Sequence, residues 1–130
     1  MKKKLLLILL FAFCIAGTTK AQTNYTVDKV ANGTLVNGDL KLGKFAQLKT
    51  RFQATLFNNA LVFDEGYDGS GNTYFKFTRK IPMNDNNSSK WNALDRYKTA
   101  CQITIVDGIE TSFIMIKYID SNKVTVYRTL

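Results

Sequence analysis

Residues able to perform chemistry are few in this chain. The 130 residues include no histidine, which removes the usual general base for a Ser or Cys nucleophile and the commonest zinc ligand. Cysteine occurs twice, as Cys14 and Cys101. These counts give no basis for a thiolate metal site, and we predict neither a bound metal nor a cofactor.

Ten acidic residues remain as candidates for general acid and base catalysis. In glycosidases two carboxyl groups face each other about 5 to 10 Å apart across a cleft. Here nearly all the acids fall at predicted turns, where such side chains commonly bond to the backbone: Asp28, Asp39, Asp64, Glu65, Asp68, Asp85, Asp95, Asp107, Glu110 and Asp120. We predict a protein that is not an enzyme, and keep a carboxylate-dependent glycan hydrolase as the alternative.

Residues 64–72 combine acids, glycines and amides in the manner of a calcium loop, since hard cations need several oxygen ligands from a flexible segment. Counted from Asp68, however, the sixth position is Thr73 and the twelfth is Arg79, where an EF-hand needs Gly and Glu. No helix is predicted after the glycines, so they match no phosphate-binding motif either. We predict an ordinary hairpin loop here.

The N-terminus has the three regions of a secretory signal peptide. Lysines at 2–4 precede an uncharged apolar run over residues 5–16, which is too short to span a membrane. Small and polar residues follow, and we predict cleavage between Ala21 and Gln22. The ending of this segment resembles bacterial signal peptides, which implies a periplasmic or secreted protein.

On this prediction residues 1–21 are a leader and residues 22–130 form a single exported domain. Four of the 18 basic residues leave with the leader and all ten acids stay, so the net charge falls from +8 to +4. Such a modest excess does not favour nucleic acid as a partner, and no membrane span is expected after cleavage. Cys14 also leaves, preceded by a Phe that does not suit lipid attachment. Cys101 is therefore predicted to be a buried thiol rather than a link to another chain.

Alternation of apolar and polar residues, interrupted by turn residues, predicts strands along most of the mature chain. Residues 49–57 could also present a helical face, but their alternation favours a strand, with a helical turn allowed at 44–48. Asn58-Asn59 is expected to form a two-residue hairpin turn with positive φ. Pro82 is expected to end a strand before the longest loop, residues 83–95. The strands expected in this half are residues 25–31, 35–45, 49–57, 60–63 and 73–81, with breaks at Asn32-Gly33 and Asn37-Gly38.

The C-terminal part is predicted as a three-stranded meander over residues 96–106, 109–119 and 123–130. A two-residue Asp107-Gly108 turn would place Cys101 opposite Ile114. A three-residue turn with Asn122 in the left-handed conformation would then place Tyr118 opposite Val124. The face predicted to meet the core comprises Tyr97, Cys101, Ile103, Ile105, Ile114, Ile116, Tyr118, Val124 and Val126.

The opposite face of this meander combines basic and apolar residues, and in this register Lys98 lies opposite Lys117. Like charges facing each other across a ladder are unfavourable, so the cluster suggests an anionic ligand or partner. Alternatively, the lysines extend into water and the apolar residues pack under a neighbouring segment. The candidate binding patch comprises Arg96, Lys98, Lys117, Lys123, Phe113, Met115 and Tyr127.

Seven or eight short antiparallel strands predict an all-β fold, a meander that forms a closed or partly open barrel, with a β-sandwich as the alternative. The favoured function is non-catalytic binding of a small ligand or a protein partner by an exported domain. The alternatives are the glycan hydrolase already described and a structural subunit of an envelope assembly.

Overall fold

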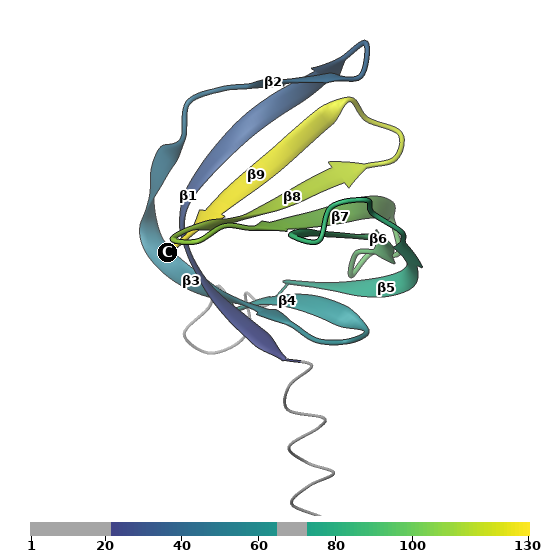
Figure 1. Ribbon diagram of the computed structural model, residues 1–130, viewed down its shortest axis with the longest axis horizontal. Helices are drawn as coiled ribbons and strands as arrows, with labels where there is room; N and C mark the ends of the chain where they lie inside the picture. Colours follow the sequence, from purple (N-terminus) through teal and green to yellow (C-terminus); the bar gives the residue numbers. More distant parts are fainter. Residues whose placement is uncertain (1–21, 65–72) are drawn as a thin grey trace, which may run out of the picture.

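The computed structural model describes residues 22–64 and 73–130, and the predicted leader and the loop at 65–72 lie outside these described residues. All regular elements in the described part are strands (Figure 1). They are β1 (Thr23–Val36), β2 (Asp39–Leu42), β3 (Ala46–Leu56), β4 (Ala60–Asp64), β5 (Thr73–Ile81), β6 (Ser88–Leu94), β7 (Ala100–Asp107), β8 (Ser112–Tyr118) and β9 (Lys123–Thr129). Across these residues the structure contains no helix with the length and hydrophobicity that a bilayer crossing requires.

The strands form a closed antiparallel barrel of eight strands, to which β2 adds one further strand. From β3 to β9, consecutive strands pair with each other. β1 closes the barrel by pairing with both β3 and β9. Figure 1 shows β1 running from beside β3 at the bottom of the view to beside β2 at the top. The prediction of an all-β antiparallel barrel is confirmed. The additional strand β2 pairs with β1 alone among the described strands, so its other edge is free.

The barrel interior is filled by apolar side chains from every strand of the barrel. Phe63 contacts three other rings, with its ring centroid 5.1 Å from that of Phe52, 5.5 Å from that of Phe75 and 5.2 Å from that of Tyr127. The Phe77 ring stacks on Trp91 at 4.5 Å. Offset and edge-to-face aromatic pairs add to the stability gained by burying their area. The remaining buried core residues are Tyr25, Val27, Ala54, Leu61, Ala93, Cys101, Ile103, Ile105, Ile114 and Ile116.

The β1–β2 hairpin depends on two positions with unusual backbone requirements. Asn37 and Gly38 both have positive φ, 52° and 84°, as a two-residue turn with right-handed strand twist requires. At Gly33, a Cβ atom would lie 2.9 Å from the Lys41 carbonyl oxygen, so only glycine allows β2 to approach this closely. The predicted break at Asn37-Gly38 is confirmed, whereas Asn32-Gly33 continues inside β1.

The predicted register between β7 and β8 is wrong by four residues. Cys101 lies opposite Tyr118, and Ile105 opposite Ile114. The last pair is Asp107 with Ser112, so the connection contains four residues and not two. Because the error is an even number, each side chain stays on its predicted face, and Cys101 is buried as predicted.

The register between β8 and β9 is wrong by one residue, which has the larger consequence. Lys117 pairs with Val124, and Asn122 is not among the residues with positive φ. A shift of one residue moves every side chain of a strand to the other face. Tyr127 therefore lies in the core with Phe52, while Val124 and Val126 are buried on the opposite face.

Four further expectations are corrected. Residues 44–48 contain no helical turn, since β3 begins at Ala46. The Asn58-Asn59 hairpin turn is present, closed by the N–H of Phe57 donating to the Ala60 carbonyl at 2.8 Å, but without positive φ. The predicted loop 83–95 contains β6, whose Trp91 and Ala93 alternate with polar residues. Tyr97 and Tyr118, both predicted on the core face, are 72% and 36% exposed.

We expect Cys101 to resist a thiol-reactive aromatic disulfide in the native protein and to react after unfolding. Burial, followed by the nearby Asp95 charge, raises the pKa of this thiol from 9.0 to about 11, and only the thiolate reacts. Since the folded pKa is the higher, stability present below pH 9 is lost as the pH rises towards 11. Mass spectrometry of labelled peptides measures the reaction. Rapid labelling of the native protein at neutral pH would contradict the predicted burial.

Candidate functional site

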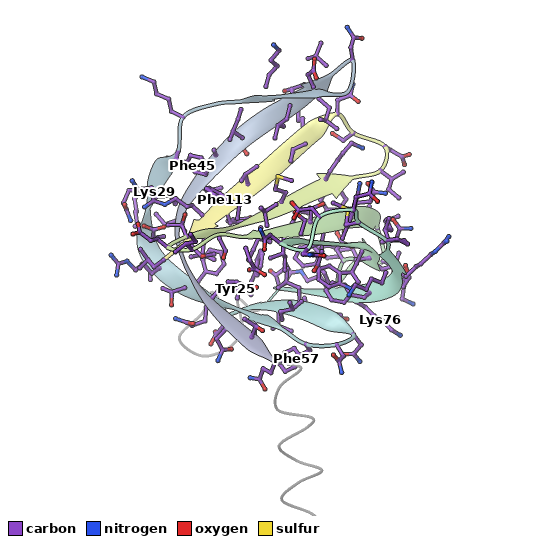
Figure 2. All side chains as sticks on the ribbon, viewed as in Figure 1. Tyr25, Lys29, Phe45, Phe57, Lys76 and Phe113 are labelled. Atoms are coloured by element: carbon purple, nitrogen blue, oxygen red, sulfur yellow. The ribbon has the colours of Figure 1, made fainter. Side chains whose placement is uncertain are left out.

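The face of β8 and β9 opposite the core carries a second apolar cluster. Val124, Val126 and Ala31 are buried there, although none of them belongs to the core cluster. Phe113 on the same face lies 6.0 Å from Phe45, in the segment between β2 and β3 (Figure 2). The β2–β3 segment thus covers part of a sheet face that would otherwise be open.

A groove extends across this face from β1 and β2 to β6, with a volume of about 270 Å³. Pockets for small molecules commonly begin near this size, at about 300 Å³, so the groove suits a small or elongated ligand group. Its lining is apolar at the β1–β2 side and becomes polar towards β6. The lining residues are Leu35, Leu40, Val124, Met115, Thr104, Gln102, Lys117 and Lys90.

The charged groups lining the groove are both basic. Lys90 and Lys117 are partly buried, and within the described residues neither has a carboxylate at ion-pair distance. The Lys117 ammonium donates to the carbonyls of Tyr118 and Ile119 at 3.2 and 3.4 Å, whereas the Gln102 amide donates to Asn92 at 3.2 Å. The groove therefore combines an apolar wall with two cations for which the described part of the chain provides no counterion.

Two residues of the predicted patch, Met115 and Lys117, line this groove. Phe113 shares their face in the contact with Phe45. Tyr127 does not belong to the patch, because the one-residue shift places its ring in the core.

The other basic residues of the patch lie apart from the groove. Lys98 is in the turn between β6 and β7 with a φ of 65°, so Gln102, not Lys98, faces Lys117. Arg96 lies over the Tyr97 ring at 4.8 Å. Lys123 borders a separate hollow beside Lys41.

The prediction missed the contribution of β1, β2 and β6 to the groove. Lys90 lies in the segment interpreted as a loop, although its alternation with Trp91 was visible in the sequence. Leu35 and Leu40 flank the Asn37-Gly38 turn, and pair with each other. The pairing of Leu35 with Leu40 could be inferred from the turn. The approach of these two side chains to β6 depends instead on closure of the barrel.

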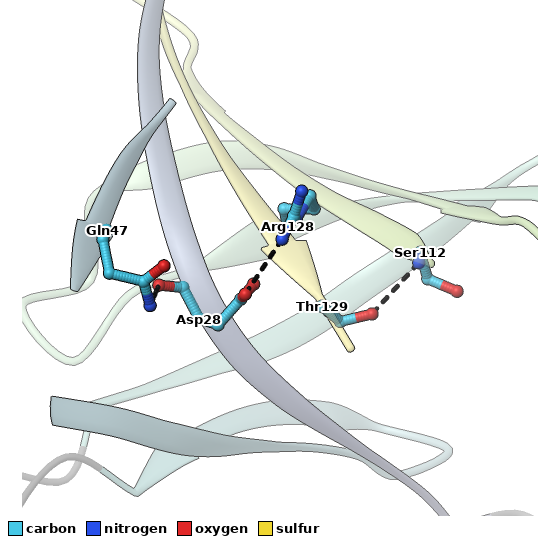
Figure 3. A network of polar contacts seen from close by, with 5 residues as sticks. All are labelled: Asp28, Gln47, Ser112, Arg128 and Thr129. Atoms are coloured by element: carbon cyan, nitrogen blue, oxygen red, sulfur yellow. Dashed lines mark hydrogen bonds and ion pairs between the residues drawn. The ribbon is translucent and has the colours of Figure 1, made fainter. Parts of the chain in front are cut away.

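An ion pair between a buried carboxylate and a partly exposed guanidinium joins β1 to the end of β9 (Figure 3). The Arg128 guanidinium donates to Asp28 Oδ2 at 3.0 Å, and the Asp28 side chain is only 4% exposed. Asp28 lies at a β-bulge between Val27 and Lys29. Arg128 holds the pKa of Asp28 below its usual range, against the opposing effect of burial. Nearby, Thr129 Oγ1 accepts from the Ser112 N–H at 3.1 Å.

A second buried carboxylate, Asp95, organises the turn between β6 and β7. Its Oδ1 accepts from the N–H groups of Tyr97 and Thr99 at 2.9 and 2.8 Å, and its Oδ2 accepts from the Tyr118 hydroxyl at 2.8 Å. Burial favours the neutral acid, but these donors together lower the pKa of Asp95. Both buried carboxylates thus favour the ionised form, the reverse of what a general acid needs.

Within the described residues no group of three or more acidic or cysteine side chains could hold a metal ion. The calcium-like segment considered from the sequence falls largely on 65–72, outside the described residues. No protein-family model, curated protein or solved structure matches the chain significantly. The interpretation of the groove accordingly depends on its own residues.

Proposed function

We propose that this protein binds a small amphipathic anion, a ligand with one negative group and an apolar body, in the groove across β8. The observation that carries the proposal is the pairing of an apolar wall with Lys90 and Lys117, for which no counterion lies among the described residues. Charge-assisted hydrogen bonds are among the stronger polar contacts. An anionic group near the lysines would leave the apolar body against Leu35, Leu40 and Met115.

The leader prediction supports export of the binding domain. β1 begins at Thr23, just after the proposed cleavage between Ala21 and Gln22, so cleavage would leave all nine described strands in the mature chain. We therefore propose a periplasmic or secreted binding protein. The lowered pKa of Asp28 and of Asp95 gives no support to the alternative of a carboxylate-dependent hydrolase.

A pair of fluorescent dyes tests the ligand class. Anilinonaphthalene sulfonate carries rings and a charge, whereas N-phenylnaphthylamine has the same rings without the sulfonate. We expect the sulfonate to bind with one-to-one stoichiometry and the uncharged dye to bind more weakly. Replacing both Lys90 and Lys117 with Gln should lower the affinity for the sulfonate dye about tenfold, corresponding to about 1.4 kcal/mol. The affinity for the uncharged dye should change little.

Lys76→Gln is the matched control, because it removes the same charge from an exposed position on β5 (Figure 2). Near-ultraviolet circular dichroism verifies that each variant keeps its fold, since partly unfolded states also bind such dyes. Equal weakening by Lys76→Gln, or equal affinity for the two dyes, would contradict the proposal.

A further inference from the structure

β2 presents a free edge of the described sheet. β2 is the terminal strand of the sheet and pairs only with β1. All four of its residues are exposed, with Leu40 at 38% and Leu42 at 41%. An edge of this kind offers unpaired backbone groups to another strand.

Two backbone hydrogen bonds establish which β2 residues direct their backbone groups to the free edge. The N–H of Leu35 donates to Asn122, on the β9 side of β1, and the N–H of Gly43 donates to Asn32 on β1. Backbone direction alternates along a strand. Asp39 and Lys41 therefore direct their N–H and C=O groups towards β1, while Leu40 and Leu42 direct theirs to the free edge.

We propose that β2 pairs with β2 of a second copy of this chain, antiparallel across a two-fold axis at Leu40. In this register Leu40 of each copy forms the hydrogen-bonded pair, and Asp39 of one copy lies opposite Lys41 of the other, twice. These are non-hydrogen-bonded pairs, in which opposing side chains come closest. The edge is thus complementary to itself in charge and in hydrogen bonding.

Neighbouring registers lack this match. Moving the axis to Lys41 would place the two Lys41 side chains opposite each other, and moving it to Asp39 would do the same with the two aspartates. Like charges directly opposite are unfavourable. An axis at Leu42 would leave Lys41 facing Gly43. Charged residues on an edge usually oppose association, but here the two-fold axis pairs each with its opposite.

The dimer would also extend the proposed groove. Opposing residues in an antiparallel pair project to the same face, so Leu40 of the second copy would lie beside the Leu40 that lines the groove. Four residues make a small interface, and small interfaces form weak, transient complexes. We therefore expect dissociation on dilution.

Charge reversal tests the proposed register without added ligand, so its outcome is independent of the dye experiments. Sedimentation should give a dimer for the unaltered protein at millimolar concentration, and a monomer for Asp39→Lys and for Lys41→Asp. The double variant restores opposite charges and should dimerise again. Circular dichroism verifies the fold of each variant. A monomeric unaltered protein, or a double variant that stays monomeric while the unaltered protein dimerises, would overturn the proposal.

Discussion

Replacing Arg128 with Met is expected to lower the free energy of unfolding by about 3 kcal/mol. Met keeps much of the side-chain length but removes the cation, which leaves the Asp28 carboxylate buried and without its ion-pair partner. Removing one member of a buried pair is costly because the remaining charge cannot reach water. In the unaltered protein only Oδ2 of the Asp28 carboxylate bonds to Arg128, since Oδ1 has no hydrogen-bond partner among the described residues. Urea denaturation measures the loss.

Two comparisons distinguish this cause from a general effect of losing a charge. Lys49→Met removes a cation from an exposed position, and should change stability by less than about 0.5 kcal/mol. Asp28→Asn combined with Arg128→Met neutralises both members, and should recover part of the loss. If the double variant were less stable than Arg128→Met alone, the buried charge would not be the cause.

The same pair gives a pH dependence. Because the pKa of Asp28 is lower in the folded protein than in the unfolded chain, its contribution is fully present above the unfolded value of about 3.9. It is lost as the pH falls through the folded pKa. In Arg128→Met, burial still disfavours the carboxylate, so this acid-dependent loss of stability should disappear. Unfolding curves between neutral and acidic pH test the difference.

Replacing Asp95 with Ala is expected to cost about 3 kcal/mol, because one side chain accepts hydrogen bonds from three donors. Two of these are backbone N–H groups of the turn, and the third is the Tyr118 hydroxyl. The same turn holds Lys98 at positive φ, a conformation that costs energy in a non-glycine residue. Without Asp95 the turn loses the contacts that offset that cost.

Asp85→Ala is a close control, because Asp85 also accepts from a backbone N–H and a side-chain hydroxyl, those of Asn87 and Ser88, at 2.8 and 3.2 Å. Asp85 is exposed, so water can replace its contacts, and we expect a loss below about 1 kcal/mol. Tyr118→Phe removes only one donor to Asp95 and should fall between the two aspartate variants. Equal losses for Asp85→Ala and Asp95→Ala in urea would show that burial does not strengthen these bonds.

Prediction of the fold succeeded where short-range alternation carried the information. The period of two fixed the strand type in β3, β5, β7 and β8, and Pro82 marked the end of β5. Prediction failed where polar residues masked an alternating segment, as in β6, and where the length of a turn had to be inferred. The four-residue turn after Asp107 did not change which side chains of β7 and β8 face the core. One extra residue before Lys123, by contrast, places Tyr127 in the core where Val126 was predicted.

The amino-acid sequence by itself determined which reactive side chains are present: no histidine, one cysteine after residue 21, and a net charge of +8 over the full chain. It also determined a fold made of strands, because alternation is a local property of neighbouring residues. Only the tertiary structure decided the groove, since Leu40, Met115 and Lys90 come from strands far apart in the chain. Their meeting depends on closure between β1 and β9. Closure and register arise from long-range pairing, in which a single residue of turn length changes the face of an entire strand.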